Sequence, residues 1–263
     1  MKLTSLRIRN FRGLSDITVN FERNANVIVG PNAVGKTSVL EALRLAKALL
    51  APRIDNEAQH VLISLGAISP HNPARINLAA LCGTSGSNVI IAATFELESA
   101  EIDGLDALVP QVAMDVVRAS LGLNSAAAQL NIVQYLSSPA GAQAIINATN
   151  QIAAGIPAIK TTKSLNLELT IDAKAQNIRG TNQLHQLIFA ALENRLAPHQ
   201  TFFSYFPADR ALPTGDVQIQ IGGPDIAAQL QAHSMNPQQK YPRLKTTIVN
   251  SRFLSKVTEL TSI

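Results

Sequence analysis

Eight consecutive residues near the N-terminus have the types and spacing of a loop that binds phosphate groups. Residues 30–37 read Gly-Pro-Asn-Ala-Val-Gly-Lys-Thr and fit the pattern G-x-x-x-x-G-K-S/T. The glycines let the backbone wrap closely around phosphates, and a helix N-terminus offers them unpaired N–H groups. In this pattern Lys36 contacts the β- and γ-phosphates, and the Thr37 hydroxyl binds Mg²⁺. The motif therefore predicts that the chain binds a nucleotide.

The flanking residues supply the strand and the helix that this loop requires. The apolar run Val27-Ile28-Val29 is typical of a buried parallel strand. Apolar residues recur at helical spacing after Lys36, namely Val39, Leu40, Leu43, Ala46 and Leu50. The alternative is a turn that contains Gly and Lys by chance. The strand and the helix expected on either side make this alternative much weaker.

The first fifty residues carry a further pattern. Residues 3–9 and 17–21 alternate polar and apolar side chains like two half-buried strands, and Asn-Phe-Arg-Gly-Leu at 10–14 lies between them. Together with the phosphate loop and the Val-Leu-Glu-Ala-Leu that follows it, this segment resembles the N-terminus of ABC-type ATPases of the RecF, SMC and OLD group. The match is dense over residues 3–50 and faint beyond them.

The resemblance implies an α/β fold, the N-terminal lobe of an ABC-type P-loop ATPase head with an N-terminal β-meander and a helical insertion. It implies ATP and Mg²⁺ as ligands, with Thr37 on the metal, Asn32 beside the γ-phosphate and Arg12 near the nucleotide. Two alternatives stay open: Arg12 as a solvated strand-end arginine, and Asn32 as a simple turn residue. Many relatives have Gly at the position of Ala33. The candidate ATP-binding residues are Arg12, Gly30, Pro31, Asn32, Ala33, Val34, Gly35, Lys36, Thr37 and Ser38.

Two elements that an ATPase of this group needs are absent from the sequence. No Asp-Glu, Asp-Asp or Glu-Glu pair occurs, so no residue is assigned as the catalytic carboxylate. No Leu-Ser-x-Gly signature occurs either, since Leu136-Ser137-Ser138 is followed by Pro139. We therefore expect the N-terminal lobe of a longer ATPase, which binds ATP but turns it over negligibly until a C-terminal lobe completes the site.

Three parts are expected along the chain: ATPase lobe over 1–99, helical insertion over 100–160, and more of the lobe over 161–263. Within them we predict helices at 54–65 and 182–196, a strand at 165–171, and a strand pair at 76–81 and 89–97. Gly155-Ile156-Pro157 is expected to close the insertion. A buried strand is expected at 202–206, before a turn at 207–213. This strand and turn resemble a segment of OLD-type ATPases, and the resemblance implies that Asp209 and Arg210 face the nucleotide or a neighbouring subunit; the alternative is an Asp–Arg pair that caps the turn.

Composition limits the setting and the partners. With 46% hydrophobic and 15% charged residues the chain is globular, and it has no apolar run long enough to span a membrane. A lone cysteine, Cys82, fits a reducing cytoplasm. The resemblance implies a second ATPase head and a nuclease or other effector as partners. The net charge of +4 adds DNA, for which the candidates are Lys240, Arg243, Lys245, Arg252 and Lys256; the alternative for this basic cluster is a solvated helix face. Two alternatives are a scaffold that binds ATP without hydrolysing it and, less favoured, a small-molecule kinase.

Overall fold

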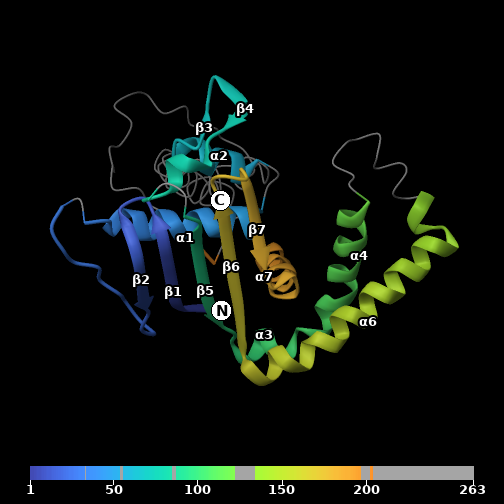
Figure 1. Ribbon diagram of the computed structural model, residues 1–263. Helices are drawn as coiled ribbons and strands as arrows, with labels where there is room; N and C mark the ends of the chain where they lie inside the picture. Colours follow the sequence, from blue (N-terminus) through green and yellow to red (C-terminus); the bar gives the residue numbers. More distant parts are fainter. Residues whose placement is uncertain (33, 54–55, 85–86, 122–133, 197–201, 204–263) are drawn as a thin grey trace, which may run out of the picture.

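A five-stranded sheet with helices on one face forms the body of the protein. The computed structural model describes residues 1–32, 34–53, 56–84, 87–121, 134–196 and 202–203. The strands lie in the order β2-β1-β5-β6-β7, and every neighbouring pair is antiparallel (Figure 1). Their bounds are β1 Lys2–Phe11, β2 Leu14–Asn20, β5 Val89–Glu96, β6 Ser164–Asp172 and β7 Asn177–Thr181.

The register places apolar side chains on one face of the sheet. Ile17, Ile8, Ile91 and Leu169 lie opposite one another across four strands and point toward the core. Residues one position along the strands point the other way, which is why Arg7 and Arg9 are exposed. On that outer face Arg7 donates to Asp16, and this hydrogen bond lowers the pKa of the carboxyl.

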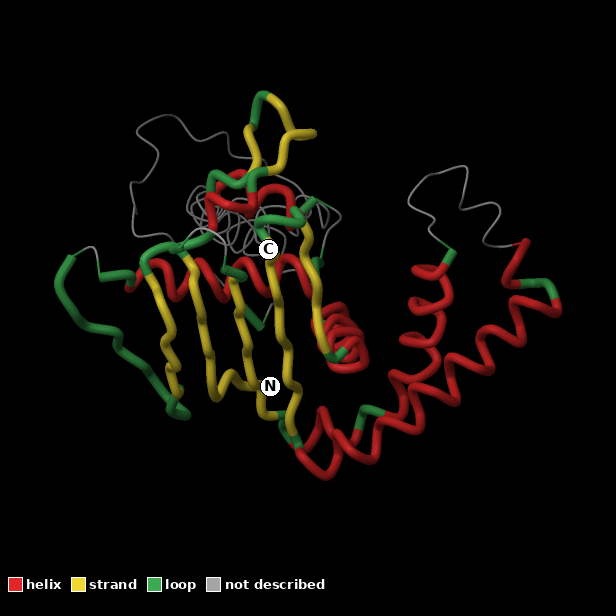
Figure 2. The backbone as a smooth tube through the Cα atoms, viewed as in Figure 1, coloured by secondary structure: helices red, strands yellow, loops and turns green. Residues whose placement is uncertain are grey.

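Helix α1 (Lys36–Leu50) covers the apolar face and crosses behind the strands in Figure 2. Its buried residues, including Val39, Leu43 and Ala46, join the core that the sheet lines. Helix α2 (Glu57–Ser64) packs beside α1, and α7 (Gln183–Arg195) packs beside β6. A short hairpin, β3 (Ile68–Ser69) with β4 (Asn72–Ile76), precedes a 3-10 turn at Leu78–Leu81, η1.

Two helices form an arm that leads away from the sheet. The chain enters it through α3 (Ser99–Asp103) and a 3-10 turn, η2 (Asp106–Leu108). The arm itself is α4 (Val109–Ser120) packed on α6 (Pro139–Thr162), and Figure 1 shows it extending beyond the β7 side. A second apolar cluster, which includes Leu105, Val112 and Ile156, joins the base of the arm to α7.

The helix α6 ends later in the sequence than predicted. Gly155 and Pro157 were expected to close the helical segment, yet α6 continues through both to Thr162. Proline at an interior position removes one helical N–H and costs stability, but burial can offset that. Here α6 approaches α7 so closely that a Cβ on Gly155 would lie 2.2 Å from Leu184 Cδ2. Tertiary packing therefore carries the helix past its proline.

The expected strand pair at 76–81 and 89–97 is wrong as a pair. Leu78–Leu81 forms η1, and β5 pairs with β1 and β6 instead. The turn-rich residues between them suggested a hairpin, but Asn10 holds this segment by long-range hydrogen bonds. The predicted strands at 3–9, 17–21 and 165–171 and the helices at 54–65 and 182–196 all occur, within a few residues of the expected bounds. The α/β class is confirmed.

Three predictions from the sequence concern, at least in part, residues that the structure does not describe. Outside the described residues lie positions 204–206 of the expected strand, Asp209 and Arg210, and the basic cluster from Lys240 to Lys256. Phe202 and Phe203 are described, and both are half-buried outside any strand. Among the helices that the structure describes, none is long and apolar enough to cross a membrane.

Candidate nucleotide-binding site

The phosphate loop follows β2 and ends where α1 begins at Lys36. Gly35 precedes the helix with φ 94° and ψ 12°, a left-handed conformation that favours glycine. A Cβ at this position would lie 2.5 Å from Leu14 Cδ2. The left-handed backbone and the nearby Leu14 side chain therefore both disfavour a larger residue at position 35. They explain why the motif has glycine there.

The N-terminus of α1 has the features of an anion site. Gly35 gives it no side-chain cap, and its first turn carries no acidic residue. Several N–H groups of the first turn therefore lack intrahelical partners, and they lie at the positive end of the helix dipole. The Thr37 side chain is exposed and Ser38 is half-buried, so a hydroxyl is available beside these N–H groups.

Lys36 lies folded over its own loop. Its Nζ donates to the carbonyl oxygen of Gly30 at 2.7 Å and to that of Pro31. The ammonium group is therefore held above the segment that would surround the phosphates, in a half-buried position. A lysine, a threonine hydroxyl and uncapped helix N–H groups are a donor set that fits a magnesium–triphosphate complex.

The residues directly before the loop, here called its strand flank, do not form the buried strand that the sequence predicts. Val27 and Val29 have exposed fractions of 81% and 83%, and Ile28 is 39% exposed. None of the three belongs to a described strand, so the predicted buried strand at 27–29 is wrong for the structure as it stands. An apolar run becomes a strand only when a neighbouring strand supplies hydrogen-bond partners, and no strand among the described residues lies beside this run.

Arg12 is tied to the helix that carries the loop. Its guanidinium forms an ion pair with Glu41 and donates to the carbonyl oxygen of Leu65 at 3.1 Å. Glu41 lies four residues after Thr37, so both side chains occupy the same face of α1, one turn apart. Arg12 is therefore positioned near the helix N-terminus rather than freely solvated. Its contact with nucleotide stays a prediction.

Asn10 is a structural residue that sequence reasoning did not single out. Its side chain accepts from the Thr84 N–H at 2.7 Å and donates to the carbonyl oxygens of Thr84 and Ser87. The Gly83 N–H donates to the Asn10 carbonyl at 3.0 Å. Asn10 has φ 54°, a conformation that asparagine tolerates better than most residues. The Asn-Phe-Arg segment therefore fastens the 82–87 loop and α1 to the same turn.

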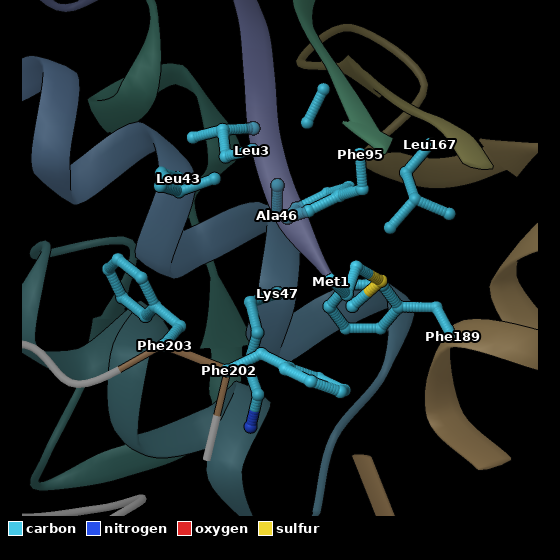
Figure 3. A pocket seen from close by; sticks show the side chains of 11 residues that line it. Met1, Leu3, Leu43, Ala46, Lys47, Phe95, Leu167, Phe189, Phe202 and Phe203 are labelled. Atoms are coloured by element: carbon cyan, nitrogen blue, oxygen red, sulfur yellow. The ribbon is translucent and has the colours of Figure 1, made fainter. Parts of the chain in front are cut away.

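An apolar cavity of about 90 Å³ lies elsewhere, between the sheet and α1. Met1, Leu3, Phe95, Phe189, Phe202 and Phe203 are among its lining residues (Figure 3). Among the lining residues, Lys47 alone has a charged side chain, and it donates to both carboxylate oxygens of Glu57, at 2.7 and 2.8 Å. Its ammonium group therefore already has a buried partner. This cavity has no group suited to hold a phosphate.

The predicted residues divide into three sets. The first set lies on the loop and at the start of α1: Gly30, Pro31, Asn32 and Val34 through Ser38. The second is Arg12, whose guanidinium forms an ion pair with Glu41 on α1. Ala33 lies outside the described residues, as do Asp209 and Arg210. Within the described part of the chain, no group of three His, Cys, Asp or Glu side chains could hold a metal ion. The role of Thr37 as a ligand of Mg²⁺ stays a prediction.

Comparison with known proteins agrees with this geometry. The family model described as AAA ATPase domain matches residues 1–261. A 64-residue stretch is 41% identical to the DNA replication and repair protein RecF of Limosilactobacillus reuteri and covers 24% of this chain and 17% of that protein.

Two further RecF proteins give similar matches. The one from Lactococcus lactis subsp. cremoris is 34% identical over 59 residues, covering 22% of this chain and 16% of the relative. The one from Gloeothece citriformis is 39% identical over 62 residues, covering 24% and 16%. The matched segments span about a sixth of the length of these relatives.

Proposed function

The chain belongs to the AAA ATPase domain family, and from that premise we propose that it binds MgATP through residues 30–38 as the N-terminal lobe of an ABC-type ATPase. The observation that carries the proposal is the uncapped N-terminus of α1, with Lys36 folded over the loop and Thr37 exposed beside it. The confirmed membership in the family makes ATP the preferred nucleotide.

Each residue of the loop has a separate task in this proposal. The N–H groups of the first turn of α1 donate to phosphate oxygens, and Lys36 gives up its carbonyl partners to contact the β- and γ-phosphates. The Thr37 hydroxyl holds Mg²⁺, which neutralises charge on those phosphates. Asn32 and Arg12 lie at the edge of the site, and the Arg12–Glu41 pair holds the guanidinium near the helix without leaving it unpaired.

Hydrolysis requires groups that this proposal places outside these 263 residues, in a C-terminal lobe. A carboxylate that polarises the attacking water and a signature helix from a second head would complete the site. Closure of two heads over ATP then precedes turnover.

The setting that we propose is DNA repair or maintenance, or defence against phage, within the RecF, SMC and OLD group. RecF proteins are DNA replication and repair proteins by name, and the basic residues from Lys240 to Lys256 offer charge for a phosphate backbone. An alternative is an assembly scaffold that binds ATP without hydrolysing it and recruits a nuclease or a DNA-binding protein. It would be favoured if ATP drives oligomerisation of the complete protein with no release of phosphate.

Two measurements on the 263-residue chain test the proposal. Isothermal titration with ATP and Mg²⁺ should give micromolar binding, and release of inorganic phosphate should stay at the level of a protein-free control. Binding without turnover supports the lobe. Turnover that a single carboxylate substitution in this chain abolishes would contradict it, and so would the absence of any binding.

A further inference from the structure

The apolar cavity between the sheet and α1 has no part in the proposed nucleotide site. Its volume is about 90 Å³. The first residue of α1 that lines it is Leu43, about two helical turns after Lys36 at the phosphate loop. The inner face of the sheet and α7 contribute further lining residues, among them Leu3, Ala93, Phe95, Leu167 and Phe189 (Figure 3). A molecule in this space would therefore contact the sheet and both helices.

Two short side chains leave this space open. Ala93 lies on the inner face of β5 between two larger residues, Ile91 and Phe95, and Ala46 lines the cavity from α1. Ala93 is 3% exposed and Ala46 is 4% exposed, so both methyl groups lie inside the core. Atoms that border a void lose dispersion contacts on that side, and a guest molecule that fills the void restores them.

Aromatic rings form much of the cavity wall. The ring centroids of Phe95 and Phe189 are 4.9 Å apart, and their planes are tilted by 58°. Those of Phe189 and Phe202 are 6.1 Å apart, with a tilt of 56°. Aromatic pairs favour such tilted contacts, because the positive edge of one ring meets the negative face of the other. A further aromatic ring inside the cavity can make the same kind of contact with these side chains.

The same lining disfavours a charged or strongly polar guest. Among the lining residues that the structure describes, Lys47 alone has a charged side chain, and its Nζ donates to both carboxylate oxygens of Glu57. A charged guest would therefore lose its hydration without gaining an opposite charge. Water is also held poorly in an apolar cavity, because a buried water typically makes about three hydrogen bonds. The cavity therefore suits a neutral apolar molecule.

We propose that this cavity binds a small neutral aromatic molecule, no larger than a single ring, and that the bound ring holds α1 against the sheet. An engineered apolar cavity of about 150 Å³ holds benzene. A space of about 90 Å³ therefore leaves no room for a second, fused ring. The site is separate from the phosphate loop, and it does not depend on whether the chain binds a nucleotide.

Thermal unfolding of the 263-residue chain, followed by circular dichroism with benzene as the probe, tests the proposal. A ligand that binds only the folded state raises the midpoint temperature Tm. With benzene at about ten times its Kd, Tm should rise by about 3–6 °C. Benzoate, the same ring with a negative charge, should leave Tm unchanged. No rise with benzene, or an equal rise with benzoate, would overturn the proposal.

A substitution that fills the cavity tests where benzene binds. Ala93→Leu places a larger side chain in this space and should abolish the rise in Tm with benzene. The matched control is Ala153→Leu, the same change at an exposed residue of α6, and it should respond to benzene as the wild-type chain does. An equal rise in Ala93→Leu and in the control would show that benzene binds elsewhere, and the proposal would fail.

Methyl NMR of the wild-type chain locates benzene without any substitution, and it decides the question if Ala93→Leu does not fold. The ring current of bound benzene should shift the methyl signals of Leu43, Ala46 and Leu167, which line the cavity. The signals of Val117, which is 3% exposed on α4 in the arm, should stay in place. Unshifted signals at all three lining residues would contradict the proposed site.

Discussion

The two flanks of the phosphate loop are held in opposite ways. On the helix side, α1 is buried in the core, bound to Arg12 through Glu41 and to Glu57 through Lys47. On the strand side, Val27 and Val29 are more than four-fifths exposed and pair with no described strand. The difference shows that the antiparallel sheet supports the helix half of the site without any strand at 27–29.

This contrast shows which contacts hold the start of α1. The positive end of α1 is fixed by long-range contacts from residues 10–14, and these do not depend on the strand. The following four substitutions probe that contrast in order of decreasing expected effect on the free energy of unfolding.

The largest effect is expected at the buried pair that anchors the far end of α1. Glu57→Ala leaves Lys47, whose side chain is 7% exposed, as an unpaired buried charge. Removing one partner of such a pair destabilises proteins by about 3–5 kcal/mol. Urea unfolding followed by circular dichroism measures the loss. Lys160→Ala is the matched control, because it removes an ion pair whose Asp106 partner is 70% exposed, and it should cost less than about 1 kcal/mol.

A smaller loss is expected at Asn10. Asn10→Ala removes the side-chain partner of the Thr84 N–H and of two carbonyl oxygens, and some of these groups then stay buried without a hydrogen bond. The expected cost is about 1–3 kcal/mol. Asn20→Ala, at an exposed residue of β2, is the comparison variant. Equal urea midpoints for the two variants would show that Asn10 does not hold the 82–87 loop.

Gly35→Ala should cost about 1–2 kcal/mol, because alanine resists a left-handed backbone and its Cβ meets Leu14. Thermal unfolding gives the change, and the same variant should bind ATP more weakly. Gly13→Ala serves as the control, since a Cβ there has nothing within 4 Å and its φ is not left-handed. A larger loss at Gly13 than at Gly35 would contradict the proposed packing of the loop.

The smallest effect is expected on the strand flank. Val29→Ser removes an apolar side chain that is 83% exposed, so stability should change by no more than about 0.5 kcal/mol. Val39→Ser, at a residue of α1 that is 4% exposed, should be far more costly. If Val29→Ser proved as harmful as Val39→Ser, residues 27–29 would be a buried strand in solution, and the contrast between the flanks would disappear.

Much of the body could be predicted from local sequence pattern. Strict alternation located β6, and helical spacing located α1 and α7, because one buried face decides each of these elements. The phosphate loop was found from four fixed positions, and the left-handed backbone of Gly35 is the physical reason that one of them is glycine.

The errors arose where distant contacts decide the structure. The run at 27–29 has a strand composition but no neighbouring strand among the described residues. Leu78–Leu81 forms a 3-10 turn instead of a strand, and the residues after it are hydrogen-bonded to Asn10, far away in sequence. The packing of Gly155 against Leu184 carries α6 through Pro157. None of these contacts leaves a periodic signal in the sequence.

The central claim is that the loop before α1 holds the phosphates of ATP, and a titration of three proteins tests it most directly. The wild-type chain and Lys174→Ala, a substitution at an exposed residue between β6 and β7, should bind MgATP with equal affinity. Lys36→Ala removes a charged contact worth about 1.5–3 kcal/mol and should weaken binding about tenfold to a hundredfold or abolish it. Binding of MgATP by Lys36→Ala with the affinity of the wild-type chain would contradict the account.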